Sequence, residues 1–156
     1  MSEEKFMRLA IEKAREGMEK GQSPFGACVV KNGEVISCVH NVVWQTTDIT
    51  AHAEVHAIRE ACKKLGVVDL EGCVIYSTCE PCPMCFSAIH WANISKIVFG
   101  GRIADAQDGG FSELTISNEE MKKLGGSPVE IVAGFMKKEN VELFEEWGRL
   151  EKRRVY

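Results

Sequence analysis

Two short motifs constrain this chain more than any other feature, because their side chains can act together only if the fold makes them neighbours. One is the triplet His52-Ala53-Glu54, and the other is a Pro-Cys-Pro-Met-Cys run that contains Cys82 and Cys85. One imidazole and two thiolates supply three ligands for Zn²⁺ and leave the fourth position open for water, which is typical of a catalytic zinc. Glu54 is close enough to move protons without being a ligand. Because bound Zn²⁺ lowers the pKa of its water to about 7, the motifs predict hydroxide chemistry at neutral pH.

Each motif taken alone has an ordinary interpretation. A Cys-x-x-Cys pair can be half of a structural zinc site or a redox pair, so a structural zinc-binding module is the non-enzymatic alternative. His56 lies one turn beyond His52, and two such histidines can share a metal, but the metalloprotease form needs Glu directly after the first His, where Ala53 stands. We expect His56 to be a surface residue or a neighbour of the ligands. The two motifs together favour catalytic zinc.

Hydrophobic periodicity and turn residues predict a mixed α/β arrangement. Asn32-Gly33 between two β-rich runs predicts a hairpin. Both metal motifs fall at predicted helix N-termini, whose partial positive charge favours thiolates and hydroxide on the metal. The alternation predicts a five-stranded mixed sheet with helices on both faces. The expected helices are 3–20, from 50 or 51 to 65, 83–92 and 140–156, and the expected strands are 25–31, 34–40, 74–78, 96–100 and 129–134.

Length, composition and charge limit the number of domains and the classes of partner that the chain can have. Its 156 residues, 45% of them hydrophobic, predict one domain over 1–156. The net charge of -4 favours a small-molecule substrate over nucleic acid. No stretch approaches the roughly 20 apolar residues of a membrane span, and the acidic start is unlike a signal peptide. We therefore expect a cytoplasmic protein without membrane contact.

The remaining cysteines predict buried thiols. Cys28, Cys38, Cys62 and Cys73 lie in apolar surroundings, and free cysteine in a reducing compartment explains them better than disulfides do. Cys79 precedes Cys82 by three residues, which could suggest an iron–sulfur cluster, but no fourth cysteine completes that set. We interpret Cys79 as a buried thiol.

The motifs also carry a family resemblance. Residues 22–100 resemble the cytidine deaminase-like superfamily, and the similarity to small bacterial guanine deaminases extends to Asn41, Trp91, Gly110-Phe111 and the aromatic-rich tail that ends at Tyr156. The resemblance implies a three-layer α/β/α sandwich and a homodimer whose C-terminal segment is exchanged to complete the partner's pocket. Within residues 22–100 it rests on Pro24-Phe25-Gly26-Ala27, Thr50-Ala51-His52-Ala53-Glu54, Glu80-Pro81-Cys82-Pro83-Met84-Cys85 and Ala88-Ile89.

The resemblance also implies a reaction, the hydrolytic deamination of a nucleobase by Zn²⁺ held by His52, Cys82 and Cys85, with Glu54 carrying protons. Guanine, converted to xanthine and ammonia, is the favoured substrate. Cytosine or an isocytosine-type base and the wobble adenosine of tRNA are the alternatives.

Six residues are candidates for substrate contact. Asn41 offers an amide donor and acceptor to a ring edge. Glu113 stands where the guanine enzymes usually carry aspartate and could reach a purine amino or imino group. Phe25 and Trp91 could be stacking walls or simple core residues. The candidates are Phe25, Asn41, Ala53, Trp91, Glu113 and Tyr156.

Overall fold

A five-stranded mixed sheet organises the molecule, for which the computed structural model describes residues 2–156. The strand order is β2-β1-β3-β4-β5; β1 is antiparallel to β2 and β3, whereas β3, β4 and β5 are parallel. In chain order the elements are α1 (Glu3–Glu19), β1 (Gly26–Lys31), β2 (Glu34–His40), α2 (Val43–Thr46), α3 (Ala53–Leu65), β3 (Cys73–Cys79), α4 (Pro83–Trp91), β4 (Lys96–Gly101), α5 (Ile103–Asp108), α6 (Asn118–Gly125), β5 (Glu130–Val132) and α7 (Lys137–Gly148).

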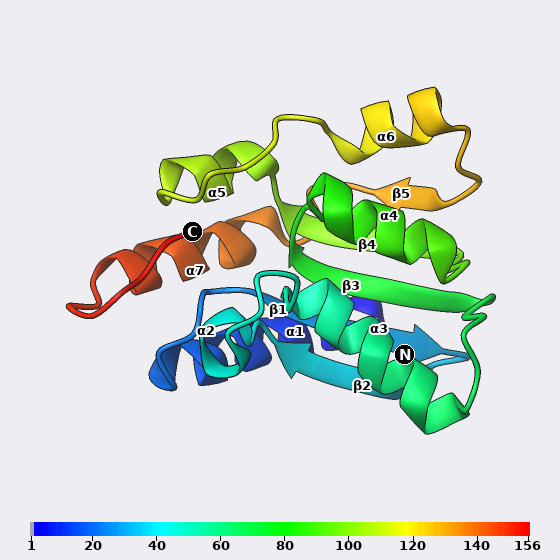
Figure 1. Ribbon diagram of the computed structural model, residues 1–156, viewed down its shortest axis with the longest axis horizontal. Coiled ribbons are helices and arrows are strands. Elements are labelled where there is room, and N and C mark those ends of the chain that lie inside the picture. The colour runs from blue at the N-terminus through cyan, green and yellow to red at the C-terminus, as the bar shows by residue number, and fades with distance from the viewer. Residues whose placement is uncertain (1) are drawn as a thin grey trace.

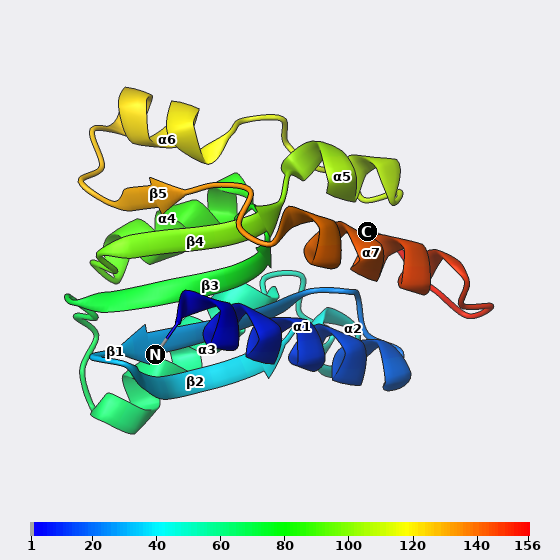
Figure 2. The same cartoon turned by 180° about the vertical axis from the view of Figure 1, so that it is seen from behind.

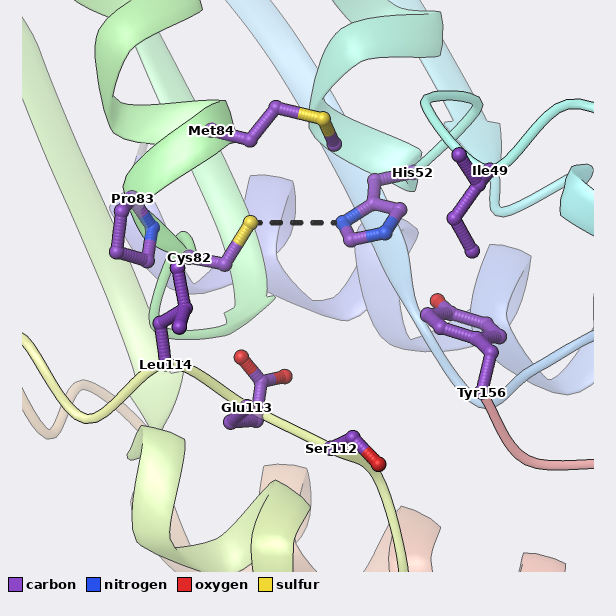
Figure 3. Close-up of a pocket in the computed structure, with 9 residues that line it drawn as sticks. All are labelled: Ile49, His52, Cys82, Pro83, Met84, Ser112, Glu113, Leu114 and Tyr156. Atoms are coloured by element: carbon purple, nitrogen blue, oxygen red, sulfur yellow. Dashed lines mark hydrogen bonds between the residues drawn. The ribbon is translucent and has the colours of Figure 1, made fainter.

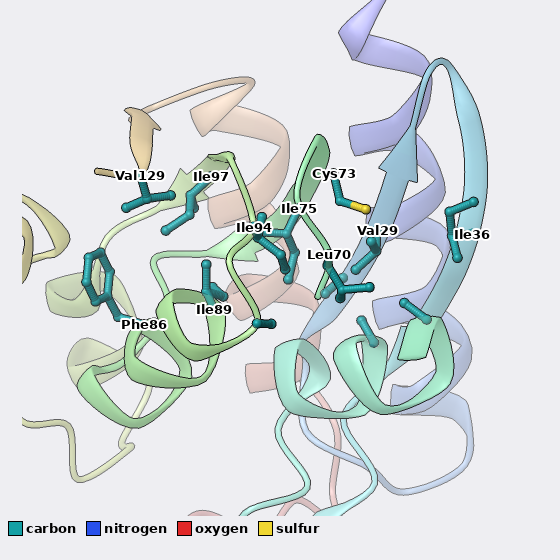
Figure 4. Packing of buried hydrophobic residues seen from close by; sticks show 14 of the residues in the cluster. Val29, Ile36, Leu70, Cys73, Ile75, Phe86, Ile89, Ile94, Ile97 and Val129 are labelled. Carbon is teal, nitrogen blue, oxygen red and sulfur yellow. The ribbon is translucent and has the colours of Figure 1, made fainter. Parts of the chain in front are cut away.

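Helices cover both faces of this sheet, which confirms the predicted three-layer α/β/α fold. Figure 1 shows α3 and α4 in front of the strands, and Figure 2, seen from behind, shows α1 and α7 against the opposite face. One core lies between the sheet and α3 and α4, where Ile75 and Ile97 meet Phe86 and Ile89 (Figure 4). A second core packs α1 and α7 onto the other face through residues such as Met7 and Leu143. Burial of these apolar side chains is the main force that holds the layers together.

Local chemistry explains the elements that the sequence predicts well. Asn32 and Gly33 both have positive φ, 50° and 78°, as the tight turn between β1 and β2 requires. Gly66 ends α3 in the left-handed conformation with φ 70°, and Pro83 stands in the first turn of α4. These turns set the directions in which the two motif-bearing helices leave the sheet.

Several boundaries differ from the prediction. α3 begins at Ala53, with His52 just outside it, and α7 ends at Gly148, so residues 149–156 are not helical. The short helices α2, α5 and α6 were not predicted. For α6 a signal exists, because Ser117 and Glu120 form a reciprocal capping box in which Ser117 Oγ accepts from Glu120 N at 3.1 Å.

The expectation for two of the cysteines is wrong. Cys28 on β1 and Cys38 on β2 face each other in the antiparallel register with Cα atoms 4.0 Å apart, and the structure joins them in a disulfide. The pairing depends on strand register, which residue spacing alone did not reveal. Cys62, Cys73 and Cys79 are free, as predicted. Within residues 2–156, no helix is long and apolar enough to cross a membrane.

Candidate active site

The two metal motifs meet where α3 and α4 begin. His52 directly precedes α3, Cys82 directly precedes α4, and Cys85 lies in the first turn of α4. Both helices begin at the same end of the sheet, on the same face, so motifs thirty residues apart in the chain become neighbours (Figure 1). Cys82 Sγ lies 3.6 Å and Cys85 Sγ 3.5 Å from His52 Nδ1.

These three side chains fit a zinc ion. A tetrahedral centre with bonds of about 2.3 Å to sulfur and about 2.0–2.1 Å to nitrogen separates a sulfur from a nitrogen ligand by about 3.5 Å, which matches both observed distances. All three ligand atoms lie within 4.8 Å of one another. Within residues 2–156 no other group of His, Cys, Asp and Glu side chains gathers in this way. Three protein ligands leave one position for water, so the donor set is that of a catalytic centre.

The pKa values of the two cysteines differ in direction. A hydrogen bond from the Cys85 thiol, followed by the effect of His52, lowers the pKa of Cys82 to about 4. Burial is the main reason that the pKa of Cys85 rises well above its usual value. The sequence predicts thiolates at both positions; burial opposes ionisation of Cys85, whereas ligation of a metal requires both cysteines as thiolates.

Glu54 is placed to carry protons. It is buried in the first turn of α3, where its Oε2 lies 3.5 Å from Cys85 Sγ and its Oε1 lies 3.1 Å from Ser77 Oγ. Burial raises its pKa above the usual range, and the charge of Cys82 adds to that shift. A buried carboxyl group with a raised pKa can both accept and return a proton during turnover.

Two residues that competed with this assignment have other partners. His56 Nδ1 lies 2.9 Å from the carbonyl oxygen of His40 and is not among the clustered ligands. Cys79 is buried, and its thiol contacts the carbonyl of Arg102 at 3.4 Å. Neither belongs to the metal centre, in line with their interpretation from the sequence.

A pocket of about 300 Å³ opens onto the metal ligands (Figure 3). That volume is at the small end of the range for small-molecule sites. One wall comes from the metal motifs, and the opposite wall comes from the loop between α5 and α6 together with the last residue of the chain. The lining residues are Ile49, His52, Cys82, Pro83, Met84, Ser112, Glu113, Leu114 and Tyr156.

Tyr156 closes one side of this pocket. Its carbonyl oxygen accepts a hydrogen bond from Ser112 N at 2.9 Å, and its hydroxyl accepts one from Asn41 Nδ2 at 2.7 Å. Its ring packs on His52 with centroids 5.4 Å apart and edge-on against Phe111 at 5.2 Å. Tyr156, which makes these four contacts, is therefore part of the pocket wall. The exchange of the C-terminal segment between subunits, which the family resemblance implies, stays a prediction.

Glu113 lies in the pocket wall, whereas Asn41 is buried behind Tyr156 and does not line the pocket. Glu113 lines the pocket, and burial, followed by the charge of Cys82, raises its pKa to about 7. Asn41 is fully buried: its Oδ1 accepts from Val43 N at 3.0 Å while its amide group donates to Tyr156. The amide of Asn41 is therefore engaged by the tail, and its contact with a substrate remains a prediction, as does that of Glu113.

The other three candidates for substrate contact do not line the pocket. Trp91 is 85% exposed at the end of α4 and does not line this pocket, so its role as a wall stays a prediction without support from the pocket. Helical periodicity turned its side chain outward, away from the helix face that carries Cys85. Phe25 packs edge-on against Phe111 and Phe144 as a core residue behind the site. Ala53 is fully buried in the first turn of α3 and does not line the pocket.

Sequence reasoning missed the apolar rim of the pocket. Ile49 and Leu114 are 59% and 66% exposed, and Met84 is 37% exposed beside the two metal-binding cysteines. Met84 lies within the motif itself, and its position between the cysteines could have identified it. Ile49 and Leu114 come from irregular segments, where no periodicity indicates which way a side chain points.

The layered fold and the ligand set together define a zinc-dependent hydrolase, and comparison with known proteins gives its family. Residues 1–101 match the family described as the cytidine and deoxycytidylate deaminase zinc-binding region. The chain belongs to this family and is a zinc-dependent aminohydrolase, a deaminase.

Its relatives include enzymes with different substrates. It is 44% identical to guanine deaminase of Bacillus subtilis (strain 168) over 120 residues, 76% of this chain and 77% of the relative. It is 46% identical to tRNA-specific adenosine deaminase of Aquifex aeolicus (strain VF5) over 110 residues, 70% and 72% of the two chains. The solved structure of guanine deaminase from Nitrosomonas europaea superposes with a TM-score of 0.87 at 25% identity, covering 96% of this chain and 86% of the other. These comparisons give the chemistry and leave the choice of substrate open.

Proposed function

We propose that this protein hydrolyses the free base guanine to xanthine and ammonia. One observation carries the proposal: Tyr156 closes a pocket of about 300 Å³ that holds the carboxyl group of Glu113. A single base fits such a pocket, whereas a nucleotide within an RNA loop also needs room for its sugar and its neighbours. A carboxylate can accept hydrogen bonds from the amino and imino groups that guanine presents.

The residues of the site have separate roles in this reaction. His52, Cys82 and Cys85 would hold Zn²⁺, which would supply a water whose pKa is lowered to about 7. Glu54 would accept the proton of the water that adds to the carbon bearing the amino group. Glu54 then passes protons to the ring nitrogen and to the leaving amine, so that water and guanine become xanthine and ammonia. Glu113 and Tyr156 hold the base and exclude bulk water.

The experiment that tests the substrate is a panel assay of ammonia release from guanine, cytosine, isocytosine, adenosine and an anticodon stem-loop that contains the wobble adenosine. We expect turnover of guanine and little release from the other substrates. The matched control is the Glu54→Ala protein, which should bind zinc and release nothing. Efficient editing of the stem-loop without release from guanine would overturn the proposal in favour of the tRNA activity that several relatives have.

We also infer that the protein works as a homodimer. The support is three large apolar side chains in the exposed surface, Val68 after α3, Trp91 at the end of α4 and Leu124 in α6, which are 82%, 85% and 83% exposed. Exposed apolar side chains that gather into a patch are typical of protein–protein contacts. Light scattering should give twice the mass of one chain, and Trp91→Glu should lower it; a monomeric wild type contradicts the inference.

A further inference from the structure

A buried carboxylate beside the cysteine motif has no part in the chemistry described so far. The side chain of Glu80 is 2% exposed and stands two residues before Cys82. It is not a metal ligand within the described residues, and it does not line the pocket around the ligands. A charge so deeply buried has to be satisfied by hydrogen bonds or ion pairs. The partners of Glu80 therefore identify the segments that it connects.

Those partners are the first residues of two helices. Ile103 N, at the start of α5, donates to Glu80 Oε1 at 3.1 Å, and Asn118 N, at the start of α6, donates to Oε2 at 2.9 Å. Arg102 Nη1 adds an ion pair with Oε2 at 3.2 Å. The first backbone N–H groups of a helix have no partner inside the helix, and they carry partial positive charge that suits a carboxylate. One carboxylate therefore fixes the starts of both α5 and α6.

The side chain of Asn118 makes a second connection between α6 and the segment that carries the cysteines. Its side-chain Nδ2 donates to the carbonyl oxygen of Pro81 at 2.7 Å, and Asn118 is fully buried. Pro81 immediately precedes Cys82. The cysteine loop, residues 80–82, is therefore linked to α6 twice, once through the carboxylate of Glu80 and once through the side chain of Asn118. On its other side, Glu80 N donates to the carbonyl of Gly101 at 2.8 Å, which ties the same loop to the end of β4.

The chain between α5 and α6 is the part of the pocket that faces the metal. Residues 109–117 connect the two helices, and they carry Ser112, Glu113 and Leu114 of the pocket wall. Figure 3 shows this segment passing beneath Cys82, with the Glu113 carboxylate pointing into the space between the cysteine and Tyr156. Both helices that flank the segment start on the carboxylate of Glu80, so Glu80 fixes where the segment lies relative to Cys82.

We propose that Glu80 and Asn118 are positioning residues that set the distance between the metal loop and the substrate-contacting segment 109–117. They act on the base through Glu113 and do not touch it. The assignment of segment 109–117 as substrate-contacting rests on the proposed function. Loss of the hydrogen bonds made by Glu80 and Asn118 should displace residues 109–117, while the zinc ligands and Glu54 stay in place.

The test compares Glu80→Gln and Asn118→Ala with Glu119→Gln as the control. In Glu80→Gln the amide nitrogen faces a backbone N–H donor, so one of the two helix starts loses its acceptor. In Asn118→Ala only the tie to Pro81 is lost, and this variant carries the test if Glu80→Gln does not fold. Glu119 is 48% exposed in the same turn of α6 and pairs with Arg102, so its loss leaves the hydrogen bonds from Asn118 to Glu80 and Pro81 intact.

We expect bound zinc near one ion per chain in both variants, with KM raised about tenfold and kcat changed less than about threefold, because misplaced binding groups weaken positioning more than the chemical step. KM is measured on whichever base of the panel the wild type deaminates. Backbone hydrogen exchange supplies a readout that needs no substrate: it should accelerate in residues 109–117 and remain unchanged in α1 and β1. Unchanged exchange in 109–117, or zinc loss with normal exchange there, overturns the proposal. A wild type that acts on none of the free bases refutes only the proposed function.

Discussion

At the scale of the residue, Glu54 shows how burial prepares a carboxyl group for proton transfer. It is buried in the first turn of α3, and its pKa is raised by that burial. We predict that Glu54→Gln lowers kcat by about 10²- to 10⁴-fold, since the shape is kept and only proton transfer is lost. Zinc content and the thermal midpoint of unfolding should stay near wild type. Glu60→Gln, on the exposed side of the same helix, is the control, and substantial turnover by Glu54→Gln would refute this role.

Glu113 predicts a pH dependence of substrate binding. Its pKa of about 7 means that the carboxylate form, which accepts hydrogen bonds, becomes dominant as the pH rises through neutrality. If that form binds the base, the apparent KM should fall by about tenfold between pH 6 and pH 8, following the ionised fraction. In Glu113→Gln the KM should be higher and nearly flat over that range. A KM for the wild type that rises with pH would show that the protonated form is the one that binds.

At the scale of the element, close contact between α1 and β1 requires a glycine. A Cβ atom added at Gly26 would collide with the carbonyl oxygen of Ala10 and lie 2.9 Å from the nitrogen of Ala14, both of them backbone atoms of α1. We predict that Gly26→Ala lowers the free energy of unfolding by about 1–3 kcal/mol or more, because helix and strand must separate. Urea unfolding monitored by circular dichroism measures it.

Gly148 provides the matched control for that substitution. It ends α7, its φ is not positive, and a Cβ there would meet nothing within 4 Å. Gly148→Ala should therefore leave stability unchanged or raise it by about 0.4–1 kcal/mol. Equal destabilisation by both substitutions would mean that the contact with α1 is not the cause.

At the scale of the whole molecule, the last residues connect distant parts of the fold. Tyr156 contacts Asn41 and Ser112, and the guanidinium of Arg154 lies 4.3 Å from the ring centroid of Trp44. We predict that deletion of residues 154–156 leaves folding and zinc content nearly intact but lowers turnover of a free base sharply, because the pocket loses a wall and water enters. Ammonia release, bound zinc and the thermal midpoint should be measured together.

Tyr156→Phe separates the two contributions of the tail. It keeps the ring against His52 and removes the hydroxyl that binds Asn41. We expect an intermediate loss of activity for this variant. Full activity of the truncated protein would show that the tail is ordinary surface.

The sequence by itself determined the parts of this protein that depend on local chemistry. Asn32-Gly33 specified a hairpin, and the spacing of His52, Cys82 and Cys85 specified three zinc ligands at helix N-termini. The turn conformation of Asn-Gly and the ligand chemistry of the His and Cys side chains follow from the residues themselves. The family and its deaminase chemistry follow from these same short segments.

Only the tertiary structure decided which residues far apart in the chain become neighbours. Strand register paired Cys28 with Cys38, and helix rotation placed Trp91 in solvent rather than in the pocket. The return of the tail brought Tyr156 to Asn41, which is 115 residues away in the chain. Such contacts join segments that no periodicity relates. Side-chain direction in loops and at helix ends is set by the packing of the whole fold.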